Sequence, residues 1–315
     1  MVIISLLNHK FFFKFKILIN MIKKLVHFSD LHLKLFKDHD LYQLVLTDML
    51  NQFKEIQPDR VIFSGDLLHS KNQLTPELIE IASWVLTECS KIAKTIIIPG
   101  NHDALINNND RLDSLTPIIS NLNNEDIVYY RDRGVYEDEN VSWCVYSQFQ
   151  GNIPPDISDA KGIKIGLFHG PIQNLKTDLG FDFGEEAYEI NKFDGLDVVL
   201  CGDIHKRAIF DIPNGKKGMM IGSTVQQNYG ESINCHGFGI LDIETMNYKV
   251  IDLFNPKPFL SFKISSYEDI INGNEKLVNV YWKILFVVDL LGLKPKKRHK
   301  KQMMNITKLG YQEIL

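Results

Sequence analysis

The sequence has few cysteines and no C-x-x-C pair. Its four cysteines are scattered along a chain of 315 residues, at Cys89, Cys144, Cys201 and Cys235. The spacing excludes a disulfide framework and a cysteine-rich zinc site. The four thiols are therefore expected to be reduced and buried, which indicates an intracellular protein.

The sequence also lacks a long hydrophobic run and an excess of positive charge. Lysines interrupt the apolar stretch at 11–19, and an aspartate interrupts the one at 284–291. Neither reaches the roughly 18 apolar residues of a transmembrane helix, so no membrane partner is expected. The formal net charge is −4. Any surface for a nucleic acid therefore has to be local rather than global.

The composition of the whole chain is that of a globular protein, with 44% hydrophobic and 23% charged residues. Residues 1–20 hold three lysines and no acid. We interpret them as an extension outside the fold rather than a signal or membrane-surface segment, because no small-residue cleavage site follows. The main domain is predicted at 21–255. Two prolines then begin a short C-terminal region, 256–315, with a basic run at 294–301.

The first half of the main domain alternates between strand and helix patterns. Strands are predicted at 24–28, 61–63 and 95–98, with helical spacing at 41–56 and 79–92. The second of these helices is expected to start near Pro76. This order predicts an α/β fold with a parallel sheet flanked by helices. Further strands, which imply a mixed or second sheet, are predicted at 127–130, 141–146, 163–168, 198–201, 207–212, 218–221, 238–243 and 248–253.

Five loops share one pattern, in which an apolar strand is followed by side chains that can bind a metal. Parallel strands of an open sheet present such residues at one edge. Half of the ten histidines lie in or next to these loops. The candidate residues are Asp30, His32, Asp66, Asn101, His102, His169, Asp203 and His205.

The oxygen and nitrogen ligands, without thiolate, favour catalytic divalent ions such as Mn²⁺, Fe²⁺ or Zn²⁺. Asp66 is the natural bridge between two ions because one carboxylate has two oxygens. Two ions held together would serve in-line hydrolysis of a phosphoester. His102 is not needed as a ligand and is predicted either to stabilise the pentacoordinate oxyanion or to protonate the leaving oxygen. Asp103 is predicted to accept a hydrogen bond from the His102 ring and so fix its tautomer.

The ordered set D-x-H, G-D, G-N-H-D, H-G and G-D-I-H, over about residues 25–205, is similar to the signature of the calcineurin-like metallophosphoesterases. The resemblance implies two β-sheets packed as a sandwich and flanked by helices. It also implies two metal ions, most readily Mn²⁺, with Mg²⁺, Fe²⁺ or Zn²⁺ as alternatives. The first ion would be bound by Asp30, His32, Asp66 and His205, and the second by Asp66, Asn101, His169 and Asp203.

A narrower resemblance is to the SbcD-type nucleases of DNA double-strand-break repair, particularly those of phages and large viruses. It rests on H-F-S-D-L-H-L, G-D-L-L-H and the stretch G-S-T-V-Q-Q-N-Y-G-E at 222–231. It implies that His69 helps to place a DNA strand, and that 222–231 positions backbone near the site. It also implies DNA as substrate. The implied partner is an SMC-like ATPase of the SbcC type, which would dock through residues after 255. A homodimer is left open.

One residue departs from the narrower family, in which the last motif usually reads G-H-x-H. Here Asp203 occupies the place of the first histidine. A third carboxylate would lower the net charge of a site with two divalent ions from +2 to +1. We expect this change to raise the pH optimum and to favour harder ions such as Mn²⁺ or Mg²⁺.

The sequence leaves two other functions open. One is a phosphodiesterase or phosphatase for small nucleotides or phosphoproteins. The other is a scaffold subunit of an ATPase complex with a weakened metal site, for which Asp203 and the short C-terminal region are the only support. His69 and the stretch 222–231 favour DNA over both alternatives.

Overall fold

The computed structural model describes residues 21–105, 108, 111–259, 261–263 and 285–287. The chain divides into two compact units, Met1–Pro258 and Phe259–Leu315. The expectations for residues 1–20 and for the basic run 294–301 lie outside the described residues. In the second unit, the described part pairs β13 (Ser261–Lys263) in parallel with β14 (Leu285–Val287).

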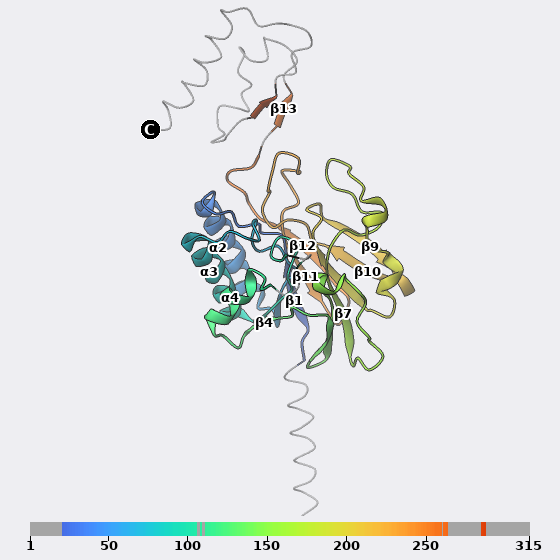
Figure 1. The fold of residues 1–315 in the computed structure, drawn as a ribbon. Helices are drawn as coiled ribbons and strands as arrows, with labels where there is room; N and C mark the ends of the chain where they lie inside the picture. Colours follow the sequence, from blue (N-terminus) through green and yellow to red (C-terminus); the bar gives the residue numbers. More distant parts are fainter. Residues whose placement is uncertain (1–20, 106–107, 109–110, 260, 264–284, 288–315) are drawn as a thin grey trace, which may run out of the picture. The chain divides into compact units, whose positions relative to one another are not determined.

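The first half of the first unit alternates between strands and helices, as the sequence predicts (Figure 1). Its four strands pair in parallel in chain order. The elements are β1 (Lys24–Phe28), α2 (His39–Ile56), β2 (Arg60–Phe63), α3 (Pro76–Ile92), β3 (Lys94–Ile97), α4 (Leu115–Leu122) and β4 (Ile127–Tyr129).

The second half supplies a second sheet and completes the first. Its strands are β5 (Gly134–Asp138), β6 (Val141–Tyr146), β7 (Ile163–His169), β8 (Val198–Gly202), β9 (Ala208–Ile212), β10 (Lys216–Met220), β11 (Gly237–Asp242) and β12 (Asn247–Asp252). The first sheet has the order β12-β11-β1-β2-β3-β4, and the second has the order β5-β6-β7-β8-β10-β9. Both are mixed, because β11, β12, β5 and β9 pair antiparallel. The predicted two-sheet α/β fold flanked by helices is confirmed.

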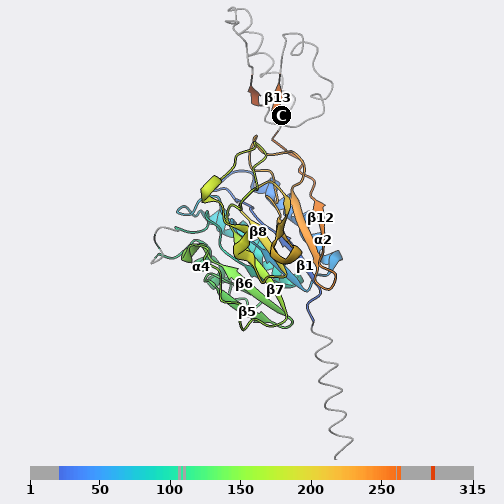
Figure 2. The ribbon, with the colours of Figure 1, turned by 90° about the vertical axis from the view of Figure 1, so that its right-hand side faces the viewer.

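Three apolar layers follow from the alternation of side chains along the strands, and one of them, with Cys144 and Phe168, lies on the outer face of the second sheet. In β1, Leu25 faces the second sheet, whereas Val26 and Phe28 face the helices. Trp143 of β6 belongs to the layer between the sheets and is fully buried. Helices α2, α3 and α4 cover the outer face of the first sheet (Figures 1 and 2). Each sheet thus has an apolar inner face that packs against the other sheet. Burial of this face fixes the register of the strands within each sheet.

Two elements differ from the sequence expectations. Helix α4 was not predicted, because Pro117 lies within its first turn and resembles a helix breaker. Strand β5 was not predicted either, because its sequence G-V-Y-E-D has only two apolar residues, which are adjacent and so show no alternation. Neither element carries a candidate site residue.

His27 of β1 makes stability depend on pH. Its ring is fully buried and hydrogen-bonded to the hydroxyls of Tyr248 and Ser64, at 2.9 and 2.8 Å. Burial lowers its pKa from 6.5 to about 3. The unfolded chain therefore binds more protons than the folded one between these pH values, and folding stability falls as the pH drops below 6.5.

We expect this loss to be missing in His27→Gln. Between pH 7 and pH 5, the free energy of unfolding of the wild type should fall by about 2 kcal/mol more than that of the variant. Urea titrations at each pH, with a chelator present, measure the difference. Parallel pH profiles would show that His27 is already charged in the folded state.

Candidate metal centre

The loops after β1 and β2 run side by side, and this brings the first candidate ligands together. The backbone N–H of Asp30 donates to the carbonyl of Gly65, and that of His32 donates to the carbonyl of Asp66, each at 3.0 Å. A bridge between Leu33 and Leu68 continues this parallel pairing. The D-x-H and G-D motifs therefore face each other because their strands are neighbours in one sheet.

The loops after β3, β7 and β8 close the site from the other side. Two glycines allow the approach. A Cβ atom on Gly100 would lie 2.0 Å from an oxygen of Asp66, and one on Gly202 would lie 2.1 Å from the Ser29 hydroxyl. The glycines in the G-N-H-D and G-D-I-H motifs are thus required by contact between loops.

One group of side chains converges on Asp30 and includes two facing histidines. The Nε2 atoms of His32 and His205 are 2.9 Å apart. They lie 3.8 and 3.9 Å from Asp30 Oδ1, and His32 Nε2 is 3.3 Å from Asp66 Oδ2. Because these atoms lie close together, Asp30, His32 and His205 could hold a metal ion. These residues, with Asp66, are the set predicted for the first metal.

A second group meets the other oxygen of Asp66. The Nε2 atom of His169 is 3.5 Å from Asp66 Oδ1 and 3.7 Å from Asp203 Oδ1. Asp30, Asp66 and His169 form another set that could hold an ion. The two carboxylate oxygens of Asp66 thus point to different groups of nitrogen ligands, which is the arrangement expected of a bridging carboxylate.

Buried atoms without a partner indicate that these groups suit a cation. Within the described chain, Asn101 Oδ1 and His169 Nε2 are buried and have no hydrogen-bond partner. Both belong to the set predicted for the second metal. A buried polar atom costs free energy unless something binds it, and a divalent ion would satisfy both atoms. The residues therefore fit the two metal ions that the sequence predicts.

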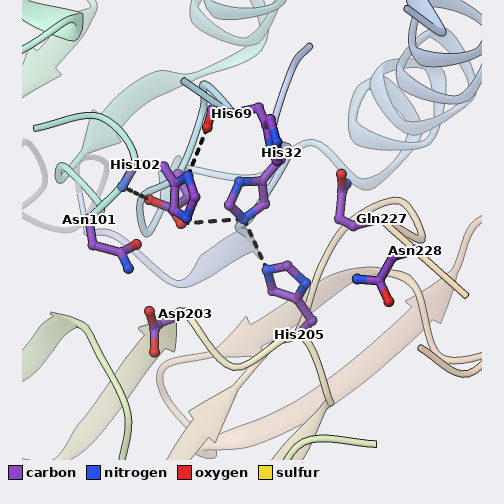
Figure 3. A pocket seen from close by; sticks show the side chains of 9 residues that line it. His32, His69, Asn101, His102, Asp203, His205, Gln227 and Asn228 are labelled. Atoms are coloured by element: carbon purple, nitrogen blue, oxygen red, sulfur yellow. Dashed lines mark hydrogen bonds and ion pairs between the residues drawn. The ribbon is translucent and has the colours of Figure 1, made fainter. Parts of the chain in front are cut away.

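A cavity of about 220 Å³ opens between the groups (Figure 3). Figure 3 shows Asn101 and Asp203 on one side of it and Gln227 and Asn228 on the other. The residues that line it are His32, Asp66, His69, Asn101, His102, Asp203, His205, Gln227 and Asn228. Asp30 and His169 lie deeper, each fully buried.

A comparison with protein families agrees with this geometry. Residues 23–207 match the model of the family described as "Calcineurin-like phosphoesterase". The chain belongs to this family. The matched segment holds the loops of all seven candidate ligands, so the broader resemblance seen in the sequence is confirmed. As a calcineurin-like phosphoesterase, the protein is expected to bind divalent metals and to hydrolyse phosphoesters.

Two similar proteins give no further specificity. "Uncharacterized protein R555" of Acanthamoeba polyphaga mimivirus is 33% identical over 258 residues, which cover 77% of this chain and 19% of the relative. The chain thus spans about a fifth of the length of that relative. The crystal structure of TT1561 of Thermus thermophilus is 11% identical, with a TM-score of 0.48, and covers 75% of this chain and 99% of the other.

No helix among the described residues could cross a membrane.

The structure changes the role of Asp103. Its carboxylate is fully buried and accepts hydrogen bonds from the backbone N–H groups of Asp66, Leu67, Leu68 and Gly100, at 2.8 to 3.3 Å. The predicted hydrogen bond to the His102 ring is wrong, because these four donors hold the Asp103 carboxylate at the turn after β2. Asp103 therefore fixes the backbone that carries Asp66.

A backbone carbonyl takes the place predicted for Asp103. The Nδ1 atom of His102 lies 2.8 Å from the carbonyl oxygen of His69. Since a carbonyl only accepts, Nδ1 carries the proton, and Nε2 is left for the cavity that His102 lines. The rings of His69 and His102 stack at a centroid distance of 5.7 Å, and His69 is exposed at the rim. His102 as proton donor and His69 as a DNA-placing residue stay predictions.

Burial and neighbouring charges shift the pKa values of the two carboxylates that line the cavity in opposite directions. For Asp66, burial opposes ionisation, but His169, His32 and the backbone N–H of His102 hold its pKa below the usual range. For Asp203, burial and the nearby acids Asp30 and Asp66 raise the pKa to about 6. A divalent ion at the second group would favour the charged form of Asp203 and so lower this pKa. The proposed effect of Asp203 on the pH optimum stays a prediction.

The sequence reasoning missed three residues near the cavity. Gln227 and Asn228 line it, and Glu231 contacts His205 behind it. All three lie in the stretch 222–231, which was expected to position backbone. Their spacing from the ligands in the sequence gives no signal, because the loop returns to the site only after β9 and β10.

Proposed function

We propose that the protein is a metal-dependent phosphodiesterase that hydrolyses DNA, as an SbcD-like exonuclease or endonuclease in DNA repair or recombination. One observation carries the phosphoesterase part of this proposal. The two oxygens of Asp66 each face a different group of ligands, so one carboxylate would bridge two ions. When bound, the two ions would supply Lewis acidity toward a phosphoryl oxygen and activate water.

The residues of the chain supply the other requirements of the reaction. Asp30, His32, Asp66 and His205 would hold one ion, and Asp66, Asn101, His169 and Asp203 the other. In its imidazolium form, His102 would keep the Nδ1 proton on the carbonyl of His69, donate the Nε2 proton to the leaving oxygen and become the neutral ring.

The choice of DNA is supported by the rim of the cavity. His69 is exposed beside His102, and the Lys71 ammonium donates to the carbonyl of Asn101 at 2.9 Å. On the other side, the Lys34 ammonium lies 3.4 Å from the carbonyl of Gln227. The two ammonium groups thus contact the backbone of Asn101 and Gln227, which line the cavity, in a chain of net charge −4. Positive charge next to the cavity supports a phosphate backbone as the ligand.

We also propose the partner that the resemblance to SbcD-type nucleases implies. An SMC-like ATPase would dock through residues after 255, most of which lie outside the described part of the chain. Mn²⁺ is proposed as the metal, since mixed carboxylate, amide and imidazole ligands suit it.

The test uses Mn²⁺ with either end-labelled linear duplex DNA or bis-p-nitrophenyl phosphate. We expect the wild type to hydrolyse both substrates. His69→Ala should lose on the order of 10²-fold in DNA cleavage, because the strand is misplaced, and keep its activity on the small ester. Turnover of the small ester alone by the wild type would instead indicate a small-nucleotide phosphodiesterase. Turnover of neither substrate would indicate a scaffold subunit.

A further inference from the structure

The loop 222–236, between β10 and β11, is anchored to the backbone of the ligand loops. Ser223 N–H donates to the carbonyl of His205 at 3.1 Å, and the Thr224 hydroxyl donates to the carbonyl of Ser29 at 2.7 Å. The Gln227 amide donates to the carbonyl of Leu31 at 3.0 Å. The loop therefore contacts the residues on both sides of Asp30 as well as His205 itself.

This loop brings one carboxylate to the rear of a candidate metal ligand. Glu231 Oε1 lies 2.7 Å from Nδ1 of His205, and the Glu231 side chain is only 7% exposed. The same oxygen accepts from the Asn228 amide at 2.8 Å. The other oxygen accepts from Gln227 N–H at 2.8 Å and from the Ser223 hydroxyl at 3.1 Å. Both oxygens are thus held in place before any ligand binds.

The consequence for His205 follows from hydrogen-bond chemistry. A carboxylate only accepts, so it holds the proton of the imidazole on Nδ1 and leaves the lone pair of Nε2 toward Asp30 and His32. A carboxylate behind a ligating histidine also makes the ring a better donor to a cation. Glu231 thereby sets both the tautomer and the direction of His205.

The three candidate histidine ligands differ in what lies behind them. His169 Nδ1 is 2.6 Å from the carbonyl of Ser64, which is a neutral acceptor. His32 Nδ1 is buried without a partner among the described residues. Only His205 of the three has a carboxylate at this position. The two metal sets are therefore supported unequally.

We propose that Glu231 is a positioning residue that tightens divalent-metal binding at the Asp30–His32–His205 group and has little effect on the His169 group. The proposal rests on the metal-dependent part of the proposed function and not on DNA as the substrate. Removing such a carboxylate typically weakens metal affinity about 10- to 100-fold.

The test is calorimetric titration of the metal-free full chain with Mn²⁺. Glu231→Gln keeps the size of the side chain but loses its charge and turns an amide N–H toward one of its donors. It should weaken one of two binding events about tenfold and leave the other unchanged. Glu231→Ala should weaken the same event by up to about 100-fold.

The matched control is Glu137→Gln in β5. Glu137 also accepts from a serine hydroxyl, that of Ser142 at 3.0 Å, and from a backbone N–H, that of Lys161 at 3.3 Å. It belongs to the second sheet, away from the ligand loops, so both binding events should match the wild type. Thermal unfolding without metal separates lost metal affinity from a disordered loop.

Two results would overturn the proposal about Glu231 and leave the proposed function unaffected. One is a wild type that binds two ions and a Glu231→Gln variant that binds them equally well. The other is an equal weakening of both events together with a lower unfolding temperature in the absence of metal, which would make Glu231 a general stabilising residue. A wild type that binds no Mn²⁺ would instead overturn the proposed function and this proposal with it.

Discussion

Asp66→Asn is expected to reduce hydrolysis of bis-p-nitrophenyl phosphate by on the order of 10³-fold, because it removes the bridge between two ions. In the structure, Asp66 Oδ2 lies 3.3 Å from His32 Nε2, and Oδ1 lies 3.5 Å from His169 Nε2. An asparagine offers only one oxygen and turns an amide N–H toward the other group. The variant should therefore bind one ion per chain at most, which elemental analysis of the purified protein would measure.

A suitable control for this variant is Asp59→Asn. The Asp59 carboxylate accepts from the backbone N–H groups of Lys23 and Lys24, each at 2.8 Å, at the start of β1. It lies at the opposite end of the strand from the ligand loop. This variant should keep both ions and full turnover. Two bound ions and full turnover in Asp66→Asn would contradict the bridging role.

His102→Ala is expected to keep both ions and to lose about 10²- to 10⁴-fold in turnover of DNA, since it removes a proton donor. The His102 ring lines the cavity, and its Nδ1 is engaged by the carbonyl of His69. The defect should depend on the leaving group. A p-nitrophenolate leaves without protonation, so the loss on bis-p-nitrophenyl phosphate should be much smaller than on DNA.

Asn101→Ala provides the contrast to His102→Ala. Asn101 Oδ1 is buried and unpartnered within the described chain, as expected of a neutral ligand. Its loss should weaken the second metal first, and excess Mn²⁺ should restore turnover. Turnover of His102→Ala should not respond to added metal. If His102→Ala loses an ion, the separation of roles between these neighbours is wrong.

The sequence predicted the elements whose pattern is set by local chemistry. Strand β1 has the bounds that were expected, and α3 begins at Pro76, where a proline suits the first turn of a helix. Strand β5 and helix α4 were missed, because β5 has only two adjacent apolar residues and Pro117 lies in the first turn of α4. Buried strands are easier to predict because both of their faces must be apolar.

For the site, the sequence alone determined which side chains end the central strands, and hence the chemistry of the candidate ligands. The reason is that parallel strands in one sheet bring their carboxyl ends to one edge. Only the tertiary structure decided which atoms meet. It placed Asp103 under the backbone of the Asp66 turn and a carbonyl behind His102, and it placed Glu231 behind His205. These contacts join residues up to 37 positions apart, through backbone groups and a returning loop whose path no local pattern encodes.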